Sequence, residues 1–219
     1  MIRKTLFALA LTLFALPTLA GEGRTAIHAS AEEAQPLMAG MMAPAFDVRT
    51  ATGEPFAFDP NNMDKPVVVT FFRGGWCPYC NIHLSEMRHA EEQLKALGFE
   101  VWFMSMDKPE LLVESLEEPD IGYTLYSDAE ASATRGFGLA FRLDDEMYER
   151  YKGYGVDLEE TSGENHHVLP VPATFIIGQD GMINFAYANP SYDIRLHPTV
   201  LIAAAEAYKS DADRRMKRN

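Results

Sequence analysis

The feature that most constrains the fold is a strand-to-helix junction that carries the chain's two cysteines. The run VVVTFF, residues 67–72, is continuous in β-branched and aromatic residues, a pattern typical of a strand buried on both faces. From Cys80 to Leu97, apolar residues recur every three or four positions, which predicts one buried helical stripe. Cys77 and Cys80 therefore lie where a central strand ends and a helix begins, and open α/β sheets form their sites at that end of the strand.

The remaining segments predict an α/β sheet with helices on both faces. The first two strands form an N-terminal hairpin, and the last two form a hairpin across an Asp-Gly turn. A long, acidic, Tyr-rich insertion at residues 139–169 precedes the last hairpin. Further strands are expected at residues 45–48, 55–58, 99–106, 123–126, 173–178 and 182–188, and further helices at 111–116, 128–138 and 197–208.

The first twenty residues predict a cleaved secretory signal peptide. A short basic start precedes an apolar run, residues 5–16, that is too short to span a bilayer comfortably. The small residues Thr18 and Ala20 then lie three and one positions before the expected cleavage point. We therefore expect an exported, periplasmic protein with no membrane association after cleavage. The expected organisation is a signal peptide at 1–20, a flexible lead-in at 21–36, one domain at 37–208 and a polar tail at 209–219.

The charge of the chain excludes two classes of partner. The formal net charge is −13, and removing residues 1–20, which contain Arg3 and Lys4 but no acid, changes it to −15. An acidic protein of this size repels nucleic acids and anionic membranes, so neither is expected as a partner.

The spacing of the two cysteines favours redox chemistry over a structural role. A disulfide between residues three apart closes a very short loop, which stabilises a fold by about 2 kcal/mol at most. Gly74 and Gly75 permit a tight turn before Cys77, and Pro78 suits the first turn of a helix. Cys77 then lies at the helix N-terminus, where unpaired N–H groups favour a thiolate. We expect Cys77 to be the exposed, reactive sulfur and Cys80 to be its sheltered partner.

Four stretches within residues 37–208 carry motifs of one known family. They are MAGMMAPAFDVRTATGEPF, FFRGGWCPYCNIHLSEM, LYSDAEASATRGFGL and LPVPATFIIGQDGMINFAYANPSYDIR. In this order they resemble the AhpC/TSA, or peroxiredoxin-like, family of the thioredoxin-fold superfamily. The resemblance implies a thioredoxin-like mixed sheet flanked by helices. It also implies a cofactor-free thiol peroxidase that reduces hydrogen or organic peroxides through a Cys77–Cys80 disulfide and is recycled by a thioredoxin-like dithiol donor.

Two departures from the family pattern leave alternatives open. Peroxiredoxins usually carry P-x-x-x-T-x-x-C, and this register makes Cys80 the reactive residue and places Cys77 at the Thr position, contrary to the helix-start argument. The family's peroxide-activating Arg is replaced by Pro172. Val171-Pro172 instead resembles the cis-Pro loop of thioredoxin, which would leave the Val171 backbone free to pair with an extended substrate. The alternative function is therefore a thiol–disulfide oxidoreductase acting on protein cysteines, similar to TlpA/ResA-like reductases.

Other side chains are candidates for parts of the site. Trp76 and Tyr79 are expected to form its walls. A substitute for the missing peroxide-activating Arg could come from one of three residues, although a surface ion pair is the commoner role of such a residue. These three candidates are Arg73, Arg142 and Arg195.

A metal site is the third alternative. Cys77, Cys80 and a loop histidine could bind Cu(I), as in Sco-like relatives of the fold, but the cysteine spacing is one residue shorter than theirs. His166 and His167 are expected to be solvated in a polar loop, and no metal is expected. His83 is expected to face solvent on the helix that follows Cys80.

Overall fold

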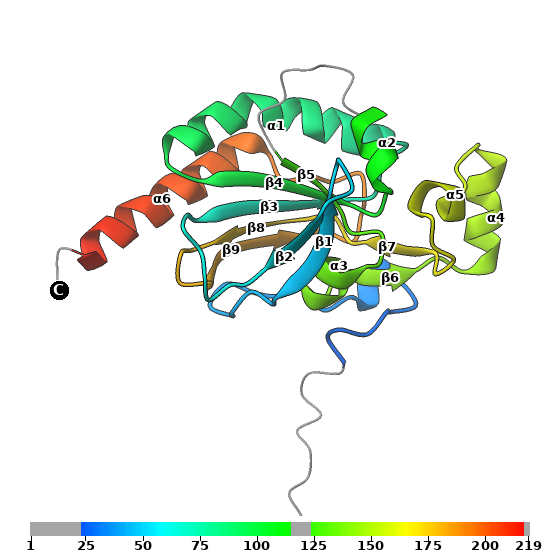
Figure 1. The fold of residues 1–219 in the computed structure, drawn as a ribbon, viewed down its shortest axis with the longest axis horizontal. Helices are drawn as coiled ribbons and strands as arrows, with labels where there is room; N and C mark the ends of the chain where they lie inside the picture. Colours follow the sequence, from blue (N-terminus) through cyan, green and yellow to red (C-terminus); the bar gives the residue numbers. More distant parts are fainter. Residues whose placement is uncertain (1–22, 115–123, 217–219) are drawn as a thin grey trace, which may run out of the picture.

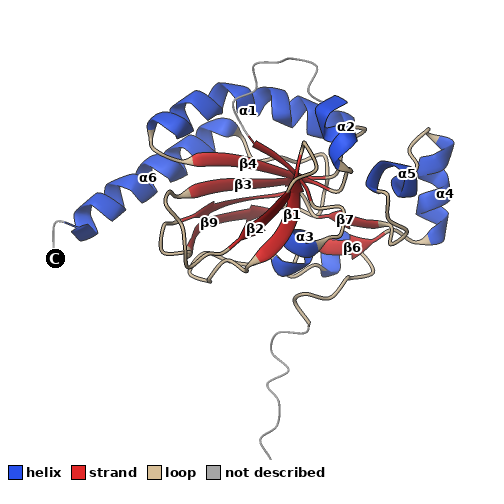
Figure 2. Cartoon of the chain, viewed as in Figure 1, coloured by secondary structure: helices blue, strands red, loops and turns tan. Residues whose placement is uncertain are grey.

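A seven-stranded mixed sheet organises the chain (Figures 1 and 2). The computed structural model describes residues 23–114 and 124–216. The strand order is β2-β1-β5-β4-β3-β8-β9, in which β3, β4 and β5 run parallel and every other pairing is antiparallel. The strands are β1 (Phe46–Thr50), β2 (Pro55–Phe58), β3 (Val67–Phe72), β4 (Glu100–Ser105), β5 (Thr124–Ser127), β8 (Ala173–Ile177) and β9 (Ile183–Ala188).

Helices cover both faces of this sheet. Figure 1 shows α1 (Pro78–Ala96), α2 (Pro109–Glu114) and α6 (Pro198–Met216) on one side, and α3 (Ser132–Gly136) on the other. The expected mixed sheet with flanking helices and two hairpins is confirmed. Among the described residues, no helix has the length and apolar character needed to cross a membrane.

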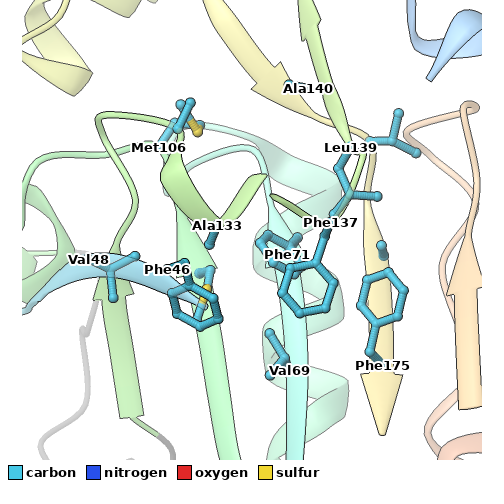
Figure 3. Packing of buried hydrophobic residues seen from close by; sticks show 14 of the residues in the cluster. Phe46, Val48, Val69, Phe71, Met106, Ala133, Phe137, Leu139, Ala140 and Phe175 are labelled. Carbon is cyan, nitrogen blue, oxygen red and sulfur yellow. The ribbon is translucent and has the colours of Figure 1, made fainter. Parts of the chain in front are cut away.

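The burial of β3 explains its unbroken apolar sequence. Val68 and Phe72 point to the face covered by α1 and α6, whereas Val69 and Phe71 point to the opposite face. On that opposite face Phe137 packs against Phe71, with ring centres 5.1 Å apart (Figure 3). Because both faces are covered, all six residues of the strand are buried, and the alternation of polar and apolar residues is absent.

The insertion forms a small structured unit beside the sheet. Its ends pair as a two-stranded antiparallel ladder, β6 (Ala140–Arg142) with β7 (Val168–Pro170). Between them lie α4 (Asp145–Gly153) and α5 (Leu158–Ser162), which Figure 1 shows at the right-hand end of the molecule. The Asp144 and Asp157 side chains accept backbone N–H bonds at the starts of these helices, which satisfies donors that a helix leaves unpaired.

The segment expected to be a flexible lead-in is docked on this unit. The His28 amide donates to the Ala140 carbonyl at 3.0 Å, and the Gln35 amide donates to the Gly138 carbonyl at 3.0 Å. Gly138 has a φ of +72°, and a Cβ there would collide with the Gln35 backbone. The sequence of the segment is small and polar, so its pairing with residues more than a hundred positions away left no local signal.

At the other end, α6 continues to Met216, beyond the expected helix end at residue 208. Much of the predicted polar tail is therefore helical. The predicted signal peptide, residues 1–20, lies outside the described residues.

Candidate active site

The turn between β3 and α1 sets the position of the two sulfurs. Cys77 is the N-cap of α1, with an extended backbone (φ −91°, ψ 113°), and Pro78 is the first helical residue. The Cys77 amide donates to the Gly74 carbonyl at 3.1 Å, which closes the turn. A Cβ on Gly74 would collide with the Trp76 indole and lie 2.8 Å from Asp107 Oδ1, so this position requires glycine.

Both cysteines are reduced in the structure, and both are buried. The exposed fractions are 2% for Cys77 and 1% for Cys80, so the expectation that Cys77 is exposed was wrong. The segment just before α6 contacts α1 here, because Arg195 Nη2 lies 3.3 Å from Cys80 Sγ and the Leu196 carbonyl accepts from His83 Nε2. This contact joins residues more than a hundred positions apart, so local sequence reasoning could not find it.

The two thiols nevertheless differ in acidity. The pKa of Cys77 is lowered to about 6, chiefly because the Cys80 thiol donates a hydrogen bond to its sulfur. Burial opposes this shift, while the Cys80 amide and the charges of Arg73 and Arg195 add to it. The pKa of Cys80 is raised, first because its proton is held in that hydrogen bond and then because of burial and the Cys77 charge. The geometry therefore favours a Cys77 thiolate beside a Cys80 thiol.

Two of the three candidate arginines lie at the thiol pair. Arg195 is half-buried, and its Nη2 lies 3.3 Å from Cys80 Sγ. Its Nε and Nη1 are buried and have no hydrogen-bond partner among the described residues. Arg73 is 3% exposed and acts on the Cys77 charge. Arg142 is different, because it is exposed and its Nε donates to the His166 carbonyl at 3.0 Å.

Trp76 and Tyr79, the predicted walls, each lie against another side chain. The Trp76 ring lies 5.5 Å from the Arg73 guanidinium carbon. Tyr79 is 45% exposed, and its ring meets that of Tyr192 edge-on at 5.6 Å between centres. Tyr192 comes from the loop before α6 and was not expected at the site.

The Val171-Pro172 segment does not form the expected cis-Pro loop. No peptide bond within the described residues is cis, so the Val171–Pro172 bond is trans. The Val171 amide already donates to the Leu139 carbonyl at 2.9 Å, and the Pro172 carbonyl accepts from the Asn189 amide at 3.1 Å. The Val171 amide is therefore not free to pair with an extended substrate, because the β6 side of the insertion occupies that position.

The structure places two buried titratable residues near the pair. Asp107 was not identified from the sequence, and His83 was wrongly placed in solvent. Asp107 follows β4 and accepts the Gly75 amide at 2.7 Å, and burial raises its pKa to about 6. Its position directly after a buried parallel strand was the available signal. His83 was expected to face solvent, but it is 4% exposed and its Nε2 donates to the Leu196 carbonyl at 3.2 Å. Burial, together with the Arg195 charge, lowers the pKa of His83 to about 4.

The loop histidines form hydrogen bonds with groups other than the thiols. His166 Nε2 donates to the Ala129 carbonyl at 2.7 Å, and His167 Nε2 lies 2.7 Å from Glu159 Oε1 with its ring stacked on Tyr148. Both are engaged rather than freely solvated. Within residues 23–114 and 124–216, no group of three His, Cys, Asp or Glu side chains is arranged to hold a metal ion.

A cavity of about 280 Å³ is lined in part by Arg73. Its walls come from the lead-in, the insertion and the loops that flank β8 and precede α6. Neither cysteine lines it, but Arg73 does, so the cavity reaches the site through this side chain. The lining includes Arg73, Arg142, Met147, Tyr151, Pro172 and Tyr192.

Comparison with known proteins agrees with this architecture. A sequence model described as "AhpC/TSA family" matches residues 39–186. Peroxiredoxin Bcp of Escherichia coli (strain K12) is 31% identical over 104 residues, which cover 48% of this chain and 66% of that protein, just under two thirds.

Solved structures show the same fold. Peroxidoxin BcpB from Mycobacterium tuberculosis superposes with a TM-score of 0.59 at 20% identity, over 78% of this chain and 97% of that one. A variant of peroxiredoxin 6 from Arenicola marina gives a TM-score of 0.64 at 16% identity, over 80% of this chain and 75% of that one.

Proposed function

Because the chain belongs to the AhpC/TSA family, we propose that it is a thiol peroxidase that reduces hydrogen or organic peroxides through Cys77 and Cys80. The observation that carries this proposal is the pair of thiols at the start of α1 with Arg195 Nη2 3.3 Å from Cys80 Sγ, and the lowered pKa of Cys77 agrees with it. A thiolate that is available at neutral pH is the form of cysteine that attacks peroxides.

In the first step the Cys77 thiolate attacks one oxygen of the peroxide, and the O–O bond breaks. Cys77 becomes a sulfenic acid, and the departing oxygen takes up a proton to leave as water or an alcohol. Arg195 is suited to this step, because its Nε and Nη1 are buried donors without a partner among the described residues. Such donors stabilise the negative charge that develops on the departing oxygen.

In the second step Cys80 loses its proton and its sulfur attacks Cys77. The S–O bond breaks, water leaves, and the Cys77–Cys80 disulfide forms. Arg195 Nη2, 3.3 Å from Cys80 Sγ, stabilises the Cys80 thiolate that this step requires. A dithiol donor of the thioredoxin type then reduces the disulfide, and the donor becomes oxidised.

We also propose that the protein acts in the periplasm. The N-terminal pattern of a basic start, an apolar run and a small-residue cleavage point supports export to the periplasm. Detection of the mature chain starting at Gly21 in a periplasmic extract would support this, and retention of residues 1–20 in the cytoplasm would contradict it.

Treatment with one equivalent of peroxide tests which of the two sulfurs attacks first. Reduced Cys77→Ser and Cys80→Ser variants are treated and analysed by mass spectrometry. We expect Cys77 in the Cys80→Ser variant to gain an oxygen, and Cys80 in the Cys77→Ser variant to remain unmodified. Steady-state peroxide consumption should fall by roughly 10³-fold or more in Cys77→Ser. The opposite labelling would assign the attack to Cys80, and equal rates in wild type and the double variant would refute peroxidase activity.

Disulfide exchange with protein cysteines is less well supported. An extended substrate would need a free backbone beside the disulfide, and the Val171 amide is occupied by Leu139. Both sulfurs are also buried, which suits a small oxidant better than a polypeptide.

A further inference from the structure

A residue of the insertion holds Arg73 beside the thiol pair. Arg73 Nη2 donates a 2.6 Å hydrogen bond to the hydroxyl of Tyr151, which lies near the end of α4. The Tyr151 ring also meets the Trp76 ring at an interplanar angle of 67°, with centres 5.8 Å apart. These contacts join α4 to the loop between β3 and α1.

Little else fixes the orientation of the Arg73 guanidinium. Arg73 is 3% exposed, and among the described residues its Nε has no hydrogen-bond partner. Its charge lies near three aromatic rings, at 5.5 Å from Trp76, 5.4 Å from Tyr151 and 4.6 Å from Tyr192. Rings attract a cation without imposing one hydrogen-bonding direction, so the Tyr151 hydroxyl sets the direction of Nη2.

The neighbouring cavity gives Arg73 room to leave this position. Arg73 and Tyr151 both line the cavity of about 280 Å³. A guanidinium released from the Tyr151 hydroxyl can turn into this space, where water would solvate its charge better than the buried position does. Such a turn moves positive charge away from Cys77.

We propose that Tyr151 is a positioning residue of the active site, whose hydroxyl holds Arg73 against the thiol pair, so that the insertion completes the site. The catalytic meaning of this role rests on the proposed peroxidase function. The effect of Tyr151 on the Cys77 thiolate is independent of the peroxidase function, because the Arg73 charge acts on the sulfur whatever the substrate is.

The other charged or titratable groups around Cys77 come from three places. They are Cys80 in α1, Arg195 in the segment before α6 and Asp107 in the loop after β4. A change at the Tyr151 hydroxyl leaves all three side chains in the protein, so an altered Cys77 thiolate is assigned to Arg73.

The test compares Tyr→Phe variants at two positions of the insertion, Tyr151 in α4 and Tyr154 just after it. Tyr151→Phe keeps the ring and removes only the hydroxyl, and Tyr154→Phe is the matched control, since Tyr154 is 75% exposed. The ultraviolet absorbance of the thiolate is followed against pH in the reduced full chain, with Cys77→Ser identifying the Cys77 signal. We expect the midpoint to rise by about half a pH unit or more in Tyr151→Phe and to stay unchanged in Tyr154→Phe.

A double variant separates positioning from packing. In an Arg73→Gln background, Tyr151→Phe should cause no further shift, because its effect passes through Arg73. An unchanged midpoint in Tyr151→Phe, or an equal shift in both backgrounds, would overturn the proposal. If the midpoint shifts as expected while the wild type consumes no peroxide, the positioning role stands and the peroxidase function fails.

Discussion

The Cys77 side and the Cys80 side of the thiol pair contain similar groups in different arrangements. Each side has one arginine and one buried titratable residue. On the Cys77 side, Arg73 lies among aromatic rings and Asp107 holds the turn. On the Cys80 side, Arg195 touches the sulfur directly and His83 ties α1 to the segment before α6.

This difference matches the different roles that we propose for the two thiols. The hydrogen bond from Cys80 and, to a smaller extent, the charge of Arg73 stabilise negative charge on Cys77, the sulfur that we propose as the attacking one. The Arg195 charge adds to this effect on Cys77, and its Nη2 is also placed to stabilise charge on Cys80 once the Cys80 proton has left. The two buried titratable groups also act in opposite directions with pH. Burial disfavours the charge on each, but Asp107 is charged at high pH and His83 at low pH.

The largest effect should come from Arg195. Arg195→Met removes the donor to Cys80 Sγ, and we expect disulfide formation after oxidation to slow by about 10²-fold, the usual effect of losing one charged donor. The sulfenic acid on Cys77 should then persist and react with a sulfenic-acid trap, quantified by mass spectrometry. Arg142→Met is the control, because Arg142 is exposed and bonds to His166. Equal trapping of the sulfenic acid in both variants would mean that Arg195 does not assist the attack by Cys80.

Asp107 should change the pH dependence of stability. Its pKa rises from the ordinary 3.8 to about 6, so the folded state keeps this proton where the unfolded state has lost it. Stability from this group is complete below about pH 4 and is lost as pH rises through about 6, by about 3 kcal/mol. Asp107→Asn should remove that loss, as measured by urea unfolding at several pH values between 4 and 6. The exposed Asp193→Asn serves as the control, and identical slopes in the two variants would contradict the assignment.

Substitution of His83 should have the smallest effect near neutral pH. The contribution of His83 to stability should change with pH in the direction opposite to that of Asp107. His83→Leu leaves the buried Leu196 carbonyl without its donor, which should lower the free energy of unfolding by about 1–3 kcal/mol. In the wild type the pKa of His83 falls from 6.5 to about 4, so its stabilisation is lost as pH drops through this window. The variant should therefore lose less stability than the wild type between pH 6.5 and 4. A parallel loss in both proteins would show that His83 does not titrate in this way.

The sequence predicted most of the central fold because those signals are local. The unbroken apolar run of β3 and the stripe from Cys80 follow directly from burial on a sheet and on one helix face. Gly74, Gly75 and Pro78 indicated the turn that places Cys77 at the start of α1. These features depend on neighbours a few residues apart, so periodicity and turn chemistry are sufficient to find them.

The site was harder to predict because its second half comes from distant segments. Arg195 and Leu196 contact Cys80 and His83, which lie more than a hundred residues earlier in the chain, so no local pattern indicates these contacts. Tyr151 lies in an insertion whose sequence carries no motif for contact with Arg73. The Val171 amide donates a hydrogen bond to the Leu139 carbonyl across the same insertion, and no local sequence pattern predicts this pairing.

The shielding of both sulfurs has a consequence for the two halves of the proposed cycle. A small peroxide needs only a narrow path to Cys77, so uptake of oxidising equivalents can proceed in the closed protein. A protein donor must bring its own sulfur into line with the disulfide, which requires the segment before α6 or the first turn of α1 to open. Oxidation should therefore depend weakly on temperature and viscosity, and reduction strongly. The protein would then be oxidised quickly, and the rate of its reduction would be limited by the rate of this local opening.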